Sequence, residues 1–125
     1  MNKSDPKLIV LLFNEAINNK DVKRLAELMS EDHLFKDRQN KVTSPKNTML
    51  EGWKEFFKAF PDYCNCFQRI ESKKDKVIIQ GYSIWHKDSK KDHVIWAAKI
   101  KDDLVAEWRI YEDTDKNRKR FFSNF

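Results

Sequence analysis

Glycine and proline are both scarce in this sequence, with 2 glycines and 3 prolines among 125 residues. This scarcity excludes collagen-like repeats, Gly/Ser linkers and proline-rich disordered tracts. Apolar residues make up 40% of the chain and aromatic residues 13%, which is enough to bury one core. We predict a single domain over residues 1–125, compact from about residue 6 to about residue 118 and ending in a polar tail.

Cysteine is nearly absent as well. Cys64 and Cys66 are the two cysteines, and side chains two residues apart on a strand point the same way, which is poor geometry for a disulfide. No Cys/His array suits a zinc ion, and no glycine-rich phosphate loop is present. We therefore expect reduced thiols, no metal and no cofactor.

Long apolar runs and a strongly one-sided charge are also missing. The run Leu8–Phe13 has six residues, too few for a signal peptide or a membrane span, so we expect a cytoplasmic protein outside any membrane. The net charge of +5 comes from 25 Lys and Arg against 20 Asp and Glu, mostly interspersed as on a solvated surface. Because the charge does not gather on a recognisable motif, nucleic-acid binding is not expected.

Apolar residues recur at helical spacing in three segments before Pro61. The first segment begins at Pro6, which suits the first turn of a helix, and the second follows Asp21, a helix-capping residue. The third starts near Pro45. The three faces consist of Ile9, Leu12, Phe13, Ala16 and Ile17; Val22, Leu25, Ala26 and Met29; and Met49, Trp53, Phe56, Phe57 and Phe60.

Four segments after Pro61 predict strands: residues 63–72, 77–86, 93–101 and 104–113. A short extended piece is expected at residues 33–37. The polar tail begins at Thr114 and is expected to end against the domain through Phe121 and Phe122. Helices followed by a four-strand meander predict an α+β fold, with three N-terminal helices packed in the concave face of a strongly curved antiparallel sheet. Such a sheet makes a cone that is open at one end.

Several stretches resemble a known family. They are His33-x-Phe35-x-Asp37; Met49-x-x-x-Trp53-x-x-Phe56-Phe57-x-x-Phe60-Pro61-Asp62-Tyr63; Gly81; and Glu107-Trp108-Arg109-Ile110-Tyr111-Glu112-Asp113. Over about residues 8–120 they resemble the SnoaL-like branch of the nuclear transport factor 2-like superfamily, which also holds ketosteroid isomerases and polyketide cyclases. The resemblance implies a cone-shaped ligand pocket. It also implies a homodimer formed through the open sheet face, near Glu107, Arg109 and Tyr111.

Asp37 is the first catalytic candidate. The resemblance places the general base of ketosteroid isomerases here, and a carboxylate against aromatic walls can take a proton from carbon beside a carbonyl. The alternative is a capping or ion-paired aspartate at the rim of the cone. His33 is the second candidate, but on an extended segment it lies about 13 Å from Asp37, so the two share a face without forming a dyad. The alternative for His33 is a histidine packed at the end of the second helix.

By the same resemblance, the tyrosine and protonated aspartate that serve as isomerase donors correspond to Phe13 and Trp96, which offer no hydroxyl or carboxyl group. Glu112 stands where polyketide cyclases carry an acid/base aspartate. Alternation along the last strand puts Glu112 on the same face as Trp108 and Ile110. The residues expected to line the pocket are Phe13, Trp53, Phe56, Tyr82, Trp96, Trp108 and Glu112.

From these residues we predict a protein that binds an apolar or aromatic small molecule in the cone. The predicted chemistry is proton transfer of the isomerase, dehydratase or cyclase type, with Asp37 as base. The alternative is a non-catalytic ligand-binding or dimerisation module whose aromatic residues fill the core.

Overall fold

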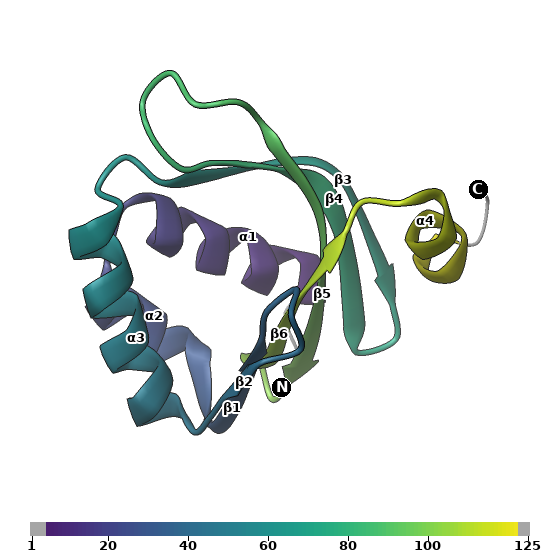
Figure 1. The fold of residues 1–125 in the computed structure, drawn as a ribbon. Helices are drawn as coiled ribbons and strands as arrows, with labels where there is room; N and C mark the ends of the chain where they lie inside the picture. Colours follow the sequence, from purple (N-terminus) through teal and green to yellow (C-terminus); the bar gives the residue numbers. More distant parts are fainter. Residues whose placement is uncertain (1–4, 123–125) are drawn as a thin grey trace.

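The computed structural model describes residues 5–122. Its helices are α1 (Pro6–Asn18), α2 (Val22–Leu28), α3 (Lys46–Ala59) and α4 (Asp115–Phe121). Its strands are β1 (Met29–Lys36), β2 (Val42–Thr43), β3 (Cys64–Lys73), β4 (Lys76–Ile84), β5 (Asp92–Lys101) and β6 (Leu104–Glu112). Figure 1 shows the curved sheet holding α1, α2 and α3 in its concave face, with α4 on the other side. This is the α+β cone predicted from the sequence.

The predicted helix starts are confirmed by their caps. Pro6 opens α1, and the Asp5 carboxylate accepts a hydrogen bond from the Lys7 backbone N–H at 2.9 Å. Asp21 caps α2 by accepting from the Arg24 N–H at 3.0 Å. The inward face of α3 buries Met49, Trp53 and Phe57. No helix of residues 5–122 is long and apolar enough to cross a membrane.

Six strands form one sheet in the order β2-β1-β6-β5-β4-β3. Strands β3 to β6 make the predicted antiparallel meander, with Cys64 and Cys66 as free thiols on β3. Strand β1 also pairs in parallel with β6, and β2 pairs with β1; neither pairing was expected from the sequence. Strand β1 begins at Met29 rather than at His33, because Met29 pairs with Val105 of β6 instead of extending the helical face. Pairing between strands so far apart in sequence leaves no local pattern.

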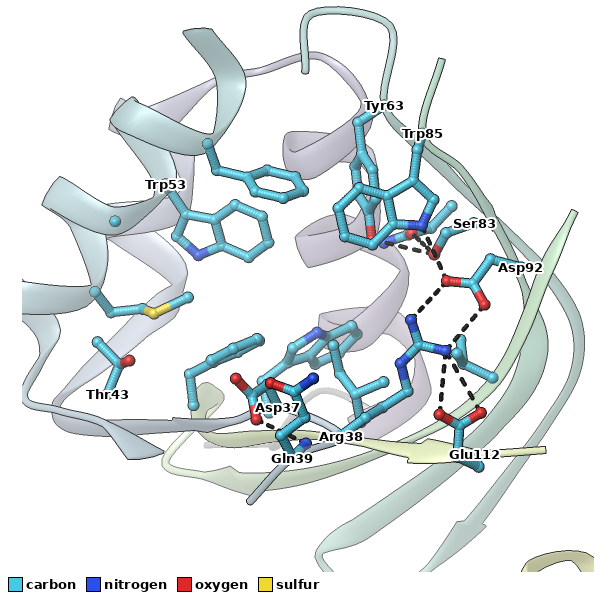
Figure 2. A pocket seen from close by; sticks show the side chains of 18 residues that line it. Asp37, Arg38, Gln39, Thr43, Trp53, Tyr63, Ser83, Trp85, Asp92 and Glu112 are labelled. Carbon is cyan, nitrogen blue, oxygen red and sulfur yellow. Dashed lines mark hydrogen bonds and ion pairs between the residues drawn. The ribbon is translucent and has the colours of Figure 1, made fainter. Parts of the chain in front are cut away.

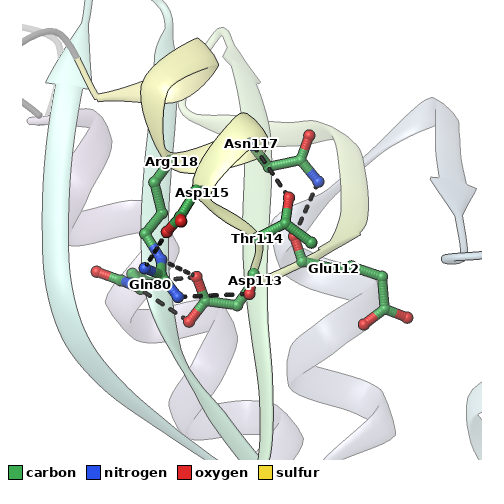
Figure 3. A network of polar contacts seen from close by, with 7 residues as sticks. All are labelled: Gln80, Glu112, Asp113, Thr114, Asp115, Asn117 and Arg118. Carbon is green, nitrogen blue, oxygen red and sulfur yellow. Dashed lines mark hydrogen bonds and ion pairs between the residues drawn. The ribbon is translucent and has the colours of Figure 1, made fainter.

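The predicted polar tail contains a helix, which corrects the sequence prediction from residue 115 onward. Figure 3 shows how α4 begins: the Thr114 hydroxyl accepts from the Asn117 backbone N–H at 3.1 Å. The carboxylate of Asp113 accepts from Arg118 Nε at 2.6 Å and from Gln80 Nε2 at 3.3 Å. The helix was missed because its seven residues carry mostly charges and no apolar period, so its stability depends on these contacts.

Two apolar clusters lie on the two sides of the sheet. The larger lies inside the cone and includes Trp96 and Trp108, each at most 1% exposed. The smaller lies on the convex face, where the buried ring of Phe122 packs with Ile78 and Ile95. Phe122 thus holds α4 against the outside of the sheet, and the expected contact between the chain end and the domain is confirmed.

Candidate functional site

A pocket of about 560 Å³ opens on the concave side of the sheet, between α3 and strands β1 and β3 to β6. Its aromatic residues are Phe35, Trp53, Phe56, Tyr63, Trp85 and Trp108. The ring of Phe56 meets those of Trp53, Tyr63 and Trp85 edge to face, with centroids 4.7 to 5.8 Å apart. Of the residues that the sequence analysis selected, the structure brings together Asp37, Trp53, Phe56, Trp108 and Glu112 on this wall.

A charged cluster stands at one side of the pocket (Figure 2). Arg38 donates to both carboxylate oxygens of Asp92, at 2.9 and 2.8 Å, and its Nη1 lies 3.5 Å from the Glu112 carboxylate. Trp85 Nε1 also donates to Asp92, at 2.9 Å. Burial disfavours the charged guanidinium, but the hydrogen bonds and charges of Asp92 and Glu112 outweigh burial and raise the pKa of Arg38. The cluster joins the chain after β1 to the start of β5 and the end of β6.

A buried chain of hydrogen bonds forms a second polar element of the wall. Ser83 Oγ donates to Asn65 Oδ1 at 2.7 Å. Because a serine hydroxyl has one hydrogen, the Tyr63 hydroxyl is the donor in its 3.1 Å bond with Ser83. The Tyr63 oxygen therefore keeps lone pairs that can accept a hydrogen bond from a ligand. Burial raises the pKa of Tyr63, so the phenol stays protonated at neutral pH.

Asp37 follows β1 directly and lines the pocket, with part of its carboxylate used in a turn. Its Oδ1 accepts from the backbone N–H groups of Gln39 and Lys41, both at 2.9 Å. Its Oδ2 takes part in no hydrogen bond within residues 5–122. The capping alternative and a ligand-facing role are thus compatible, since they use different oxygens.

The structure places His33 in the core instead of on the pocket wall. Its ring is fully buried, and Nδ1 lies 2.7 Å from the carbonyl oxygen of Val105. Because a carbonyl oxygen only accepts, Nδ1 carries the proton, and Nε2 has no partner among the described residues. Burial lowers the pKa of His33 and keeps the ring neutral. This geometry fits the alternative of a packed histidine. His33 and Asp37 do not form a catalytic dyad, as expected from the sequence.

Three other expected pocket residues also lie elsewhere. Phe13 and Trp96 are fully buried and pack against Trp108, with ring centroids 4.9 and 6.4 Å away, so they stand behind the pocket wall. Tyr82 faces the convex side, because it alternates with the pocket residue Ser83 along β4. Three of the seven residues that were expected to line the pocket therefore do not line it.

Alternation along β6 agrees with the prediction. Trp108, Ile110 and Glu112 all line the pocket. On the other face Arg109 Nε donates to Glu107 at 2.7 Å. No group of three or more His, Cys, Asp or Glu side chains within residues 5–122 is arranged to hold a metal ion.

Sequence reasoning missed several polar pocket residues, namely Arg38, Tyr63, Asn65, Ser83 and Asp92. Part of the signal was present, because Asp92 is in phase with Val94 and Trp96 along β5, whose side chains face inward. The strands predicted from the sequence end at residue 86 and resume at residue 93, so Asp92 lies outside them.

A family model described as the SnoaL-like domain matches residues 10–117. The chain belongs to the SnoaL-like domain family. The family expected from the sequence motifs is thereby confirmed. No curated protein sequence matches this SnoaL-like chain.

Solved structures share the fold at low sequence identity. An uncharacterised cystatin-fold protein from Novosphingobium aromaticivorans is 13% identical, with a TM-score of 0.79 over 88% of this chain and 100% of that one. An NTF2-like protein of unknown function from Cytophaga hutchinsonii is 10% identical, with a TM-score of 0.75 over 97% of each chain. An LEH-like epoxide hydrolase from M. tuberculosis is 14% identical, with a TM-score of 0.76 over 86% of this chain and 82% of that one. At these identities the likeness shows the fold alone.

Proposed function

We propose that this SnoaL-like protein binds a small, flat, largely aromatic molecule in the concave pocket. The observation that carries the proposal is the open volume of about 560 Å³, which lies within the range of pockets that enclose small organic ligands. The aromatic residues stand around this space instead of filling it, which favours ligand binding over the filled-core alternative. Their ring faces and edges offer stacking and edge-to-face contacts to a flat ligand.

The polar groups of the wall favour a neutral ligand with a hydroxyl or carbonyl group. The Tyr63 oxygen can accept from a hydroxyl, and Trp53 Nε1 is a buried donor without a partner among the described residues. The charged lining residues are Asp37, Arg38, Asp92 and Glu112, so carboxylates outnumber the guanidinium. This excess of negative charge disfavours an anionic ligand.

Gly52 provides a direct test of the pocket. It lines the pocket from α3, and an added Cβ would meet no atom within 4 Å, so a larger side chain can occupy the space without disturbing the core. With the neutral fluorescent probe N-phenyl-1-naphthylamine, we expect saturable binding to the wild type and binding at least about tenfold weaker to Gly52→Phe. Glu51→Phe, on the exposed side of the same helix, is the matched control and should bind like the wild type. Equal binding by both variants would place the probe outside the pocket.

A second candidate function is proton transfer with Asp37 as base. Asp37 lines the pocket, its Oδ2 takes part in no hydrogen bond within residues 5–122, and the fold is shared with a protein named as an LEH-like epoxide hydrolase. Proton abstraction beside a carbonyl would move one proton from carbon to Oδ2 and leave an enolate.

This candidate can be tested without knowing the natural substrate. In D₂O, exchange of the protons beside the carbonyl of 2-tetralone, an enolisable bicyclic ketone, can be followed by NMR. We expect the wild type to exceed the buffer rate and Asp37→Asn to lose that excess while still binding N-phenyl-1-naphthylamine. A wild type that binds 2-tetralone with no exchange above buffer would leave a binding protein and remove the catalytic candidate.

A further inference from the structure

A second hollow, of about 510 Å³, lies on the convex face of the sheet beside α4. Its floor is apolar and includes Ile78, Ala97, Tyr111 and Phe121. Its cationic residues come from four strands and from α4: Lys73, Lys76, Lys99, Arg109 and Arg120. Glu107 is the acidic residue in its lining, so cationic side chains outnumber acidic ones by five to one. We call this hollow the convex groove.

Three of these cations form a row across neighbouring strands. Lys73 of β3 pairs in register with Lys76 of β4, and Lys76 pairs with Lys99 of β5. All three line the convex groove, so their side chains leave the same face of the sheet. Like charges directly opposite each other on adjacent strands destabilise a sheet. The row therefore costs stability unless an anion lies across it.

The chain itself supplies little compensation. The next position in the row is Glu107, which pairs in register with Lys99, but its carboxylate accepts from Arg109 Nε at 2.7 Å. Lys73 Nζ donates to the backbone carbonyl of Phe121 at 3.1 Å. Within residues 5–122 no ion pair involves the ammonium groups of the lysine row.

We propose that the convex groove binds a small multivalent anion of the polyphosphate class. Adjacent phosphate groups would lie along the lysine row, with Arg109 and Arg120 at its sides. The volume suits a molecule of nucleotide size. The Arg120 guanidinium lies over the rings of Tyr111 and Phe121, at 5.5 and 4.8 Å from their centroids, which places its charge above the floor of the groove. This site is independent of the concave pocket, whose carboxylates disfavour the same ligand.

A second copy of the chain is a poorer occupant. The homodimer expected from the family resemblance would use this face, near Glu107, Arg109 and Tyr111. Isologous pairing here would bring two cationic grooves toward each other, with a net repulsion that has to be offset elsewhere. In addition, α4 already covers part of the face through Phe122. Charge complementarity therefore points to an anion.

The test compares the double variant Lys76→Gln/Lys99→Gln with Lys87→Gln/Lys90→Gln, which makes the same charge change in the loop between β4 and β5. Melting temperatures are measured at low salt with and without sodium tripolyphosphate. We expect tripolyphosphate to stabilise the wild type and the loop variant. The groove variant should melt at a higher temperature than the wild type without the anion, because repulsion is relieved, and should gain little from it. Its affinity for tripolyphosphate should fall by about tenfold or more.

Two further arms identify the ligand class. ATP without Mg²⁺ should bind at least as tightly as tripolyphosphate, adenosine should not bind, and added NaCl should weaken binding by both anions. Equal stabilisation of both double variants, or no stabilisation of the wild type, would overturn the proposal. So would binding restricted to DNA or heparin, or a wild-type dimer that dissociates in the groove variant, because a polymer or a second copy would then be the occupant.

Discussion

The guanidinium of Arg38 donates two parallel hydrogen bonds to the carboxylate of Asp92, at 2.9 and 2.8 Å. The two residues lie 54 positions apart, one after β1 and one at the start of β5, and both line the concave pocket. The pair is partly exposed, at 28% and 27% of the side chains. Only arginine offers a planar fork that matches both carboxylate oxygens, so the pair fixes the geometry of the pocket wall as well as its charge.

Replacing Arg38 by lysine should therefore weaken the contact with Asp92 in the pocket wall while keeping the positive charge. We expect a double-mutant cycle of Arg38→Lys and Asp92→Asn, followed by urea unfolding, to give a coupling energy of about 0.5–1.5 kcal/mol, reduced from a buried value by solvent screening. Arg38→Lys should also bind N-phenyl-1-naphthylamine more weakly than the wild type. Additive effects of the two substitutions would show that the fork contributes no coupling.

Replacement of glycine by alanine should have opposite effects on the free energy of unfolding at Gly81 and at Gly52. A Cβ on Gly81 of β4 would lie 2.1 Å from the backbone oxygen of Cys66 on β3, a clash that no side-chain rotation relieves. Gly81→Ala should lower the free energy of unfolding by about 1–3 kcal/mol. Gly52 lies within α3 with open space around it, so Gly52→Ala should raise the free energy of unfolding by about 0.5–1 kcal/mol. Urea denaturation of both variants checks the signs, and a neutral Gly81→Ala would contradict the tight approach of β3 and β4.

The buried hydroxyl of Tyr63 should contribute measurably to stability, whereas the hydroxyl of Tyr82 should not. Tyr63 is 5% exposed and donates to Ser83, so Tyr63→Phe leaves Ser83 with one partner fewer and should cost about 1 kcal/mol in urea unfolding. Tyr82→Phe, on the convex face of the same sheet, is the matched control and should stay within about 0.5 kcal/mol of the wild type. Similar losses in both variants would mean that the buried hydrogen-bond chain adds nothing specific.

Local periodicity predicted the elements whose partners are close in sequence. The faces of α1 and α3 and the meander of β3 to β6 follow from helical spacing and from alternation. The pairing of β1 with β6 and the docking of α4 depend on contacts such as Met29 with Val105 and Phe122 with Ile95, which join distant parts of the chain. Such contacts override local preference and leave no pattern in either segment alone.

The sequence predicted which side chains point into the cone better than it predicted which of them reach the pocket. Alternation placed Trp108, Ile110 and Glu112 on one face of the last strand, and all three line the pocket. It could not tell which inward residues reach the pocket and which are packed behind it, because that depends on how far along the cone each one lies. Trp108 lines the pocket and Trp96 packs behind it, although nothing in the sequence around the two residues distinguishes them.

The buried ring of His33 makes the stability of the fold depend on pH. Its Nδ1 donates to the Val105 carbonyl, its Nε2 is buried without a partner among the described residues, and burial lowers its pKa below the usual value of 6.5. The unfolded chain therefore takes up a proton at a higher pH than the folded chain does. Above about pH 8 neither state is protonated at this residue, and its contribution is constant. As the pH falls below about 6.5, protonation stabilises the unfolded chain, so the free energy of unfolding decreases.

We expect His33 to contribute up to about 1.4 kcal/mol per pH unit to this decrease, the limit for one proton. His33→Asn keeps a side-chain N–H near Val105 but removes the titrating ring, so urea unfolding from pH 7.5 to 5.0 should show a smaller slope in this variant. Ring NMR gives an independent check, since the His33 ring of the folded wild type should stay neutral at a pH where the same ring is protonated in the urea-unfolded chain. A His33 ring that titrates at the same pH in the folded and the unfolded protein would contradict this account, whatever the stability of the Asn variant.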